Sequence, residues 1–165
     1  MNIIDFENIN VGYDEKIILK DITLKIKEKE HWAILGANGS GKSTLMKLIQ
    51  SEIHPRKTNP YKKEILGKSN YSIFELKKEL GIITNDLHNY FAMNGSFLTG
   101  YITVLSGHYS SIGVFKHQDF SVEQHKKAKE TMKYLEIEHL ANKYVQEMST
   151  GELRKCIVAR ALIHD

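Results

Sequence analysis

The chain of 165 residues contains one cysteine, two prolines and one tryptophan, and it has no long apolar run. The single cysteine, Cys156, excludes an intramolecular disulfide and indicates a reducing compartment. No segment approaches the roughly 18 apolar residues that span a bilayer, and the N-terminus lacks the basic start of a signal peptide. We therefore expect a cytoplasmic protein, which would act at a membrane only through a partner.

A strong charge of one sign is also missing. The formal net charge is +3, and the lysines are scattered along the chain, so there is no direct signal for nucleic-acid binding. The eight histidines show no paired metal-ligand spacing. Hydrophobic residues make up 41% and charged residues 26% of the chain, which is typical of a globular domain.

One glycine-rich stretch organises the sequence. It fits the phosphate-binding pattern of Gly, four residues, then Gly-Lys-Ser. Glycines permit a loop to turn its backbone N–H groups toward a polyphosphate without a Cβ clash. The stretch consists of Gly36, Ala37, Asn38, Gly39, Ser40, Gly41, Lys42, Ser43 and Thr44.

The helix that follows this stretch adds the positive end of its dipole to the same point. Lys42 supplies a mobile charge, Ser43 offers a hydroxyl to Mg²⁺ and Thr44 can bond a neighbouring phosphate. The simpler alternative is a glycine-rich turn into a helix. The apolar run at 32–35 and the helical pattern at 45–49 favour a nucleotide site instead.

The order of elements predicts an α/β fold. Alternating patterns predict antiparallel strands at 3–9, 16–19 and 22–26, and a buried strand at 31–35 precedes the phosphate loop. We then expect a helix to about 50, a strand at 62–66, a helix at 73–80 capped by Ser72 and Glu75, and a buried strand at 81–84. Residues beyond that last strand should point toward the phosphate site. These residues are Asn85, Asp86 and His88, which alternatively only solvate a turn.

The region from 85 to 147 is predicted to be helical. Ser121 and Gln124 form a capping box for a helix at 122–135, whose inner face is Ala128, Met132 and Leu135. Ser149 and Glu152 form another capping box before the helix at 153–162. They either cap that helix only or, with Gly151, aim its N-terminus at an anion.

Together these motifs resemble the ATP-binding cassette (ABC) ATPases. The phosphate loop matches completely, Tyr13 stands where the family stacks an aromatic ring on adenine, and residues 148–152 and 159–162 match the signature segment and its helix. Residues 102–107 and 111–115 look most like the molybdate-type and photorepair-type soluble cassettes. The resemblance implies a P-loop NTPase core with an antiparallel β subdomain (1–84), an inserted α-helical subdomain (85–147) and a signature segment (148–165).

The resemblance also implies a function. The chain would be the ATP-binding subunit of an ABC transporter, using ATP and Mg²⁺ at a head-to-tail dimer with a second nucleotide-binding domain, in a homodimer or a tandem cassette. ATP held by Tyr13 and the phosphate loop would touch Ser149, Gly151 and Glu152 of the other domain. Hydrolysis would drive a membrane permease, contacted through the helical subdomain at the inner face of the plasma membrane. The alternatives are a soluble ABC ATPase in translation, repair or regulation, and an ATP-binding module without turnover.

The sequence departs from the family at three places. Asn85 stands where the family has a glutamine that acts with Lys42 in catalysis and holds Mg²⁺, and its reach is shorter; Asp86 or His88 are the other candidates. Thr150 and Glu152 replace a glycine and a glutamine, so Glu152 would bring a negative charge near the nucleotide unless it caps its own helix. Beyond Asp165 the family continues into the Walker B strand with its catalytic glutamate. We therefore expect this chain to be truncated before that strand and to bind ATP without hydrolysing it alone.

Overall fold

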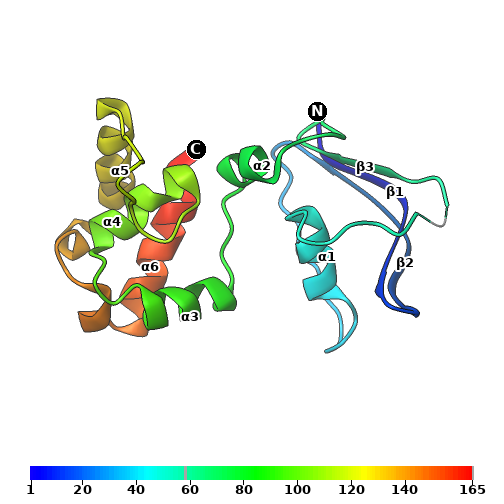
Figure 1. The fold of residues 1–165 in the computed structure, drawn as a ribbon, viewed down its shortest axis with the longest axis horizontal. Coiled ribbons are helices and arrows are strands. Elements are labelled where there is room, and N and C mark those ends of the chain that lie inside the picture. The colour runs from blue at the N-terminus through cyan, green and yellow to red at the C-terminus, as the bar shows by residue number, and fades with distance from the viewer. Residues whose placement is uncertain (58, 165) are drawn as a thin grey trace. The chain divides into compact units, whose positions relative to one another are not determined.

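The computed structural model describes residues 1–57 and 59–164 and divides the chain into two compact units, 1–76 and 77–165. Figure 1 shows the strands in the first unit and most helices in the second. Within the described residues, no helix is both long and apolar enough to cross a membrane. We predicted that the family's Walker B strand would begin after Asp165, and Asp165 itself lies outside the described residues.

The first unit is built on an antiparallel sheet in the order β2-β1-β3. Its strands are β1 (Asn2–Tyr13), β2 (Lys16–Lys27) and β3 (Lys62–Ile65). The predicted antiparallel start is therefore confirmed, but the two strands expected at 16–19 and 22–26 are one strand. Asp21 adopts a positive φ of 49° and donates its N–H to Oδ1 of Asn10 at 2.9 Å. This local hydrogen bond holds an irregularity of the ladder inside a continuous strand.

One face of the sheet carries the apolar core of the first unit. Phe6 and Ile9 of β1 are fully buried, and Leu48 of α1 (Lys42–Ile49) is also fully buried. The helix α1 contacts β2, so the phosphate loop is anchored between an apolar strand and the helix that it opens. The predicted helix after the loop and the predicted strand at 62–66 are both confirmed.

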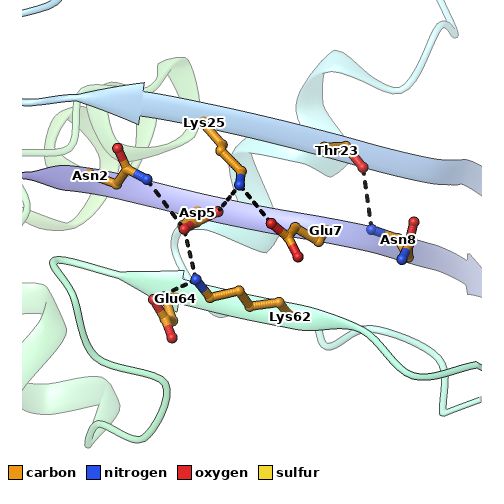
Figure 2. Close-up of polar contacts among 8 residues, drawn as sticks. All are labelled: Asn2, Asp5, Glu7, Asn8, Thr23, Lys25, Lys62 and Glu64. Atoms are coloured by element: carbon orange, nitrogen blue, oxygen red, sulfur yellow. Dashed lines mark hydrogen bonds and ion pairs between the residues drawn. The ribbon is translucent and has the colours of Figure 1, made fainter.

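The sheet also carries a row of charges that crosses all three strands. Asp5 of β1 lies between Lys62 of β3, at 2.7 Å, and Lys25 of β2, at 3.6 Å (Figure 2). Lys25 also reaches Glu7 at 2.6 Å, and Lys62 reaches Glu64 at 3.1 Å. The hydrogen bond from Lys62 lowers the pKa of Asp5, so the Asp5 carboxylate is ionised and paired at neutral pH.

Helix α2 (Ile73–Glu79) begins as predicted, and the N–H of Ser72 donates to the carboxylate of Glu75 at 3.3 Å. This contact is one half of the expected capping box.

The second unit is a bundle of α3 (Asn85–Asn94), α4 (Gly100–Leu105), α5 (Val122–Tyr134) and α6 (Thr150–Ala161). Short 3-10 helices join them: η1 (Ser106–Tyr109), η2 (Glu138–Leu140), η3 (Val145–Glu147) and η4 (Leu162–His164). Helix α6 packs against α3, α4 and α5. The predicted helix at 122–135 and its capping box are confirmed, and Ala128 and Met132 face the core with Leu135 at its margin.

The prediction of buried strands at 31–35 and 81–84 is wrong, because neither segment is a strand in this structure. A strand needs neighbours for its N–H and C=O groups, and the described part of the chain offers neither segment a paired neighbour. The apolar side chains that suggested these strands are consequently open to solvent, with Leu35 91% and Ile83 50% exposed. An apolar pattern indicates that a segment suits burial in a sheet, but it does not show whether partner strands are present.

Candidate nucleotide site

The phosphate loop takes the backbone conformation for which its glycines were singled out. Gly39 and Gly41 have φ values of 81° and 92°, a region that residues with a Cβ avoid. The N–H of Leu45 donates to the carbonyl of Gly41 at 2.8 Å, so the helix starts directly at the end of the loop. The free N–H groups of that first helical turn therefore point into the loop region.

Lys42 lies folded back over this loop. Its Nζ donates to the carbonyl oxygens of Gly36 and Ala37, both at 2.7 Å. The ammonium group is thus held at the centre of the curled backbone, where a full positive charge would meet phosphate oxygens. Two carbonyl oxygens hold it there, and no carboxylate of the described residues pairs with it, so an anion does not have to displace an ion pair among them.

A cavity of about 500 Å³ opens beside the loop, and it is lined by Lys16, Ile17, Ile18, Asn38, Gly39, Gly41, Lys42, Ser43 and Thr44. The part contributed by β2 was not anticipated from the sequence. Tyr13 is the cross-strand partner of Lys16 and is 49% exposed, so its ring stands at the end of the hairpin that forms the cavity wall. Tyr13 is not among the described residues that line the cavity, so its stacking on adenine stays a prediction.

The residues present fit a magnesium ion that arrives with a nucleotide. No group of three His, Cys, Asp or Glu side chains that could hold a metal ion occurs among the described residues. The hydroxyl of Ser43 lines the cavity in the first turn of α1, next to Lys42. A single hard oxygen suits Mg²⁺ when phosphate oxygens and water supply the other ligands.

The second motif forms a complete capping box at the start of α6. Ser149 Oγ accepts from the N–H of Glu152 at 3.3 Å, and the Ser149 N–H donates to Glu152 Oε2 at 2.7 Å. Nothing lies within 4 Å of a Cβ built on Gly151, so the helix N-terminus has open space beside it. Glu152 therefore does cap its own helix, the condition under which its charge was expected to be tolerated.

Glu152 has a further partner that the sequence did not suggest. Lys143 Nζ donates to both carboxylate oxygens of Glu152, at 2.8 and 3.0 Å. This hydrogen bond, together with the Ser149 N–H, lowers the pKa of Glu152 to about 2.

The three candidates for the glutamine position lie at the start of α3. Asn85 Oδ1 accepts from Nη2 of Arg154 at 2.9 Å, and Thr84 rather than Asn85 caps the helix. Asp86 lies in the first turn of α3. His88 Nε2 is buried and has no hydrogen-bond partner in the part of the chain that the structure describes. Among the contacts of the described residues, Asn85 is the candidate whose side-chain oxygen accepts a hydrogen bond.

The candidate residues thus gather in two groups. Asn38, Gly39 and residues 41–44 line one cavity of the first unit, which also contains Tyr13, while Asn85, Ser149, Gly151 and Glu152 belong to the second unit. The residues of each group therefore lie within a single unit. A curled glycine loop with a lysine inside it, opening a helix beside a cavity, defines a P-loop phosphate-binding site.

Comparison with known proteins narrows this class. The family model described as ABC transporter matches residues 19–165, so the chain belongs to the ABC transporter family. The ABC transporter ATP-binding protein ModF of Escherichia coli (strain K12) is 30% identical over 159 residues, which cover 93% of this chain and 31% of ModF. The predicted resemblance is confirmed by this match.

Solved structures confirm the fold class. CbiO1 from Clostridium perfringens, part of the ABC transporter complex cbiONQ, is 27% identical with a TM-score of 0.76 over 99% of this chain and 62% of CbiO1. The ATP-binding cassette MJ0796, solved as a dimer in a post-hydrolysis state with ADP and Pi, is 25% identical with a TM-score of 0.69 over 98% of this chain and 69% of that chain. The chain therefore spans about a third of ModF and less than two thirds of CbiO1.

Proposed function

We propose that this chain is the ATP-binding part of an ABC transporter subunit, which couples ATP binding and hydrolysis to transport by a membrane partner. The observation that carries the proposal is the position of Lys42. Its ammonium lies inside the curl of the phosphate loop, 2.7 Å from two carbonyl oxygens, at the wall of a cavity of about 500 Å³. Such a cavity holds a group of the size of a nucleotide.

The residues around the cavity divide the work of holding ATP. The N–H groups of the loop and of the first turn of α1 donate to phosphate oxygens, and Lys42 exchanges its two carbonyl partners for them. The exposed ring of Tyr13 stacks on the base at the end of the hairpin. Ser43 would hold Mg²⁺, and the bound ion would supply positive charge next to the phosphates.

The second group of residues completes the site from another domain. The open N-terminus of α6, with Ser149 and Gly151, faces the nucleotide of a second cassette in a head-to-tail dimer, and the Asn85 side-chain oxygen would help to hold Mg²⁺ there. The dimeric structure of MJ0796 bound to ADP and Pi supports dimerisation of this chain by likeness. In this proposal residues 1–84, 85–147 and 148–165 form the core, the helical subdomain and the signature segment.

The partner of the dimer would be a membrane permease, as the membership of CbiO1 in the cbiONQ complex suggests. The helical subdomain contacts that permease and thereby holds the protein at the inner face of the membrane. The runner-up function is that of a soluble ABC ATPase without a permease.

The proposal is tested on the whole protein expressed in its own cells. We expect steady-state release of phosphate from ATP. We also expect the protein to cofractionate with a membrane complex and to stay bound after a high-salt wash that removes loosely bound proteins. Phosphate release without any membrane-bound fraction would favour the soluble ATPase instead. Nucleotide binding without phosphate release would reduce the function to an ATP-binding module.

A further inference from the structure

The ion pair between Lys143 and Glu152 lies at the N-terminal end of α6. Glu152 is the third residue of that helix after its cap Ser149, and Lys143 binds both of its carboxylate oxygens. The two side chains remain 34% and 27% exposed, so the pair lies at the surface of the second unit beside the open space at Gly151. It is therefore within the region that the proposed function presents to a polyphosphate.

Glu152 by itself would oppose that role. A carboxylate in the first turn stabilises the helix by satisfying the Ser149 N–H and the positive end of the dipole. The same carboxylate places a full negative charge beside the surface that would meet phosphate oxygens. With a pKa of about 2 it is ionised at every physiological pH, so protonation cannot remove that charge.

Lys143 is fixed in position by its backbone as well as by its side chain. Its N–H donates to the carbonyl of Leu140 at 3.1 Å, and its own carbonyl accepts from the N–H of Gly100 at 3.0 Å. Gly100 in turn approaches so closely that a Cβ there would lie 2.3 Å from the Leu140 carbonyl oxygen. The ammonium is thus presented to Glu152 by the tightly packed junction of α4 and η2.

We infer that Lys143 is a positioning residue of the dimer site: it neutralises and holds the carboxylate of Glu152, so that the N-terminus of α6 can accept the polyphosphate bound to another copy. The inference rests on the proposed head-to-tail dimer and adds a residue to it. Lys143 itself does not touch the nucleotide. Its effect is to convert a glutamate, where the family has a neutral glutamine, into a group with no net charge.

The inference is tested by measuring how the whole protein dimerises when it binds the non-hydrolysable analogue AMP-PNP. Analytical ultracentrifugation monitors the fraction of dimer. Binding of the analogue to dilute protein is measured separately by calorimetry. Lys143→Met keeps the aliphatic stem, and we expect it to raise the concentration for half-dimerisation about tenfold, because an uncompensated charge then faces phosphate. Binding to the dilute protein should be unchanged, since the phosphate loop lies in the other unit.

The double variant Lys143→Met/Glu152→Gln separates charge compensation from damage to the fold. We expect it to dimerise like the wild type, because the neutral amide needs no counter-charge. Lys133→Met, which removes an exposed lysine of α5, serves as the matched control for net charge and should also behave like the wild type.

Three results would overturn the inference. Unchanged dimerisation of Lys143→Met would show that the charge of Glu152 needs no partner. A double variant as defective as Lys143→Met would show that Lys143 acts in another way than by neutralising Glu152. A wild-type protein that binds AMP-PNP but stays monomeric would overturn the head-to-tail dimer of the proposed function, and this inference with it.

Discussion

Gly41 and Leu19 lie so close that a Cβ built on Gly41 would stand 2.7 Å from Cδ2 of Leu19. Leu19 belongs to β2 and is buried, so its side chain has little room to withdraw. The end of the phosphate loop is therefore pressed onto the sheet at the one glycine that directly precedes α1. This contact relates the nucleotide site to the core of the first unit.

Gly41→Ala is expected to lower the melting temperature of the protein and to weaken nucleotide binding. A left-handed conformation costs a residue with a Cβ about 1–2 kcal/mol, and overpacking against Leu19 adds about 1 kcal/mol or more. Gly39→Ala is the matched control, because Gly39 has a similar φ but nothing within 4 Å of the added Cβ. Equal melting temperatures of the two variants in calorimetric unfolding would show that the Leu19 contact is unimportant.

The ring of Tyr13 is expected to contribute to ATP affinity by stacking. Tyr13→Ala should weaken ATP binding by about 1–3 kcal/mol, the range found for stacking of an aromatic ring on a base. Tyr13→Phe keeps the ring and should bind ATP like the wild type, because the ring face and not the hydroxyl makes the contact. Calorimetric titration measures both variants, and an unchanged affinity of Tyr13→Ala would remove Tyr13 from the site.

The charge row on the sheet predicts a dependence of stability on pH. The hydrogen bond from Lys62 lowers the pKa of Asp5 below the ordinary value of an aspartate, 3.8. A lowered folded-state pKa adds stability above the unfolded-state value, and this stability is lost as the pH falls through the folded-state value. Asp5→Asn should therefore reduce the urea midpoint at neutral pH and make little difference in strong acid.

Glu7→Gln is the control for this prediction. Glu7 also pairs with Lys25, but its side chain is 41% exposed, so its removal should change stability little at any pH. An Asp5→Asn variant whose loss of stability is the same at neutral and acid pH would contradict the assignment to charge.

Local chemistry made much of the fold predictable from sequence. The capping boxes at Ser121 and Ser149 were predicted correctly because each depends on two residues three positions apart. The phosphate loop followed equally from its glycines, two of which, Gly39 and Gly41, have positive φ values in the structure. These features are set by short stretches of chain and need no knowledge of distant partners.

Features that depend on distant partners were missed or wrong. The segments 31–35 and 81–84 have the apolar residues of buried strands but no paired neighbours in the described part of the chain. The wall that Lys16 contributes to the cavity requires the pairing of β1 with β2 and the approach of the loop. The pairing of Lys143 with Glu152 depends on how the chain folds through η3 between them, and the sequence predicted only that Glu152 could cap its own helix.

The central claim is that the phosphate loop binds ATP, and Lys42→Ala tests it most directly. We measure the shift in melting temperature that ATP and Mg²⁺ produce in the whole protein, which reports binding to the folded state. The account predicts a clear upward shift for the wild type and for Lys47→Ala, an exposed lysine of the same helix, and none for Lys42→Ala. An equal ATP-dependent shift in Lys42→Ala would contradict the account.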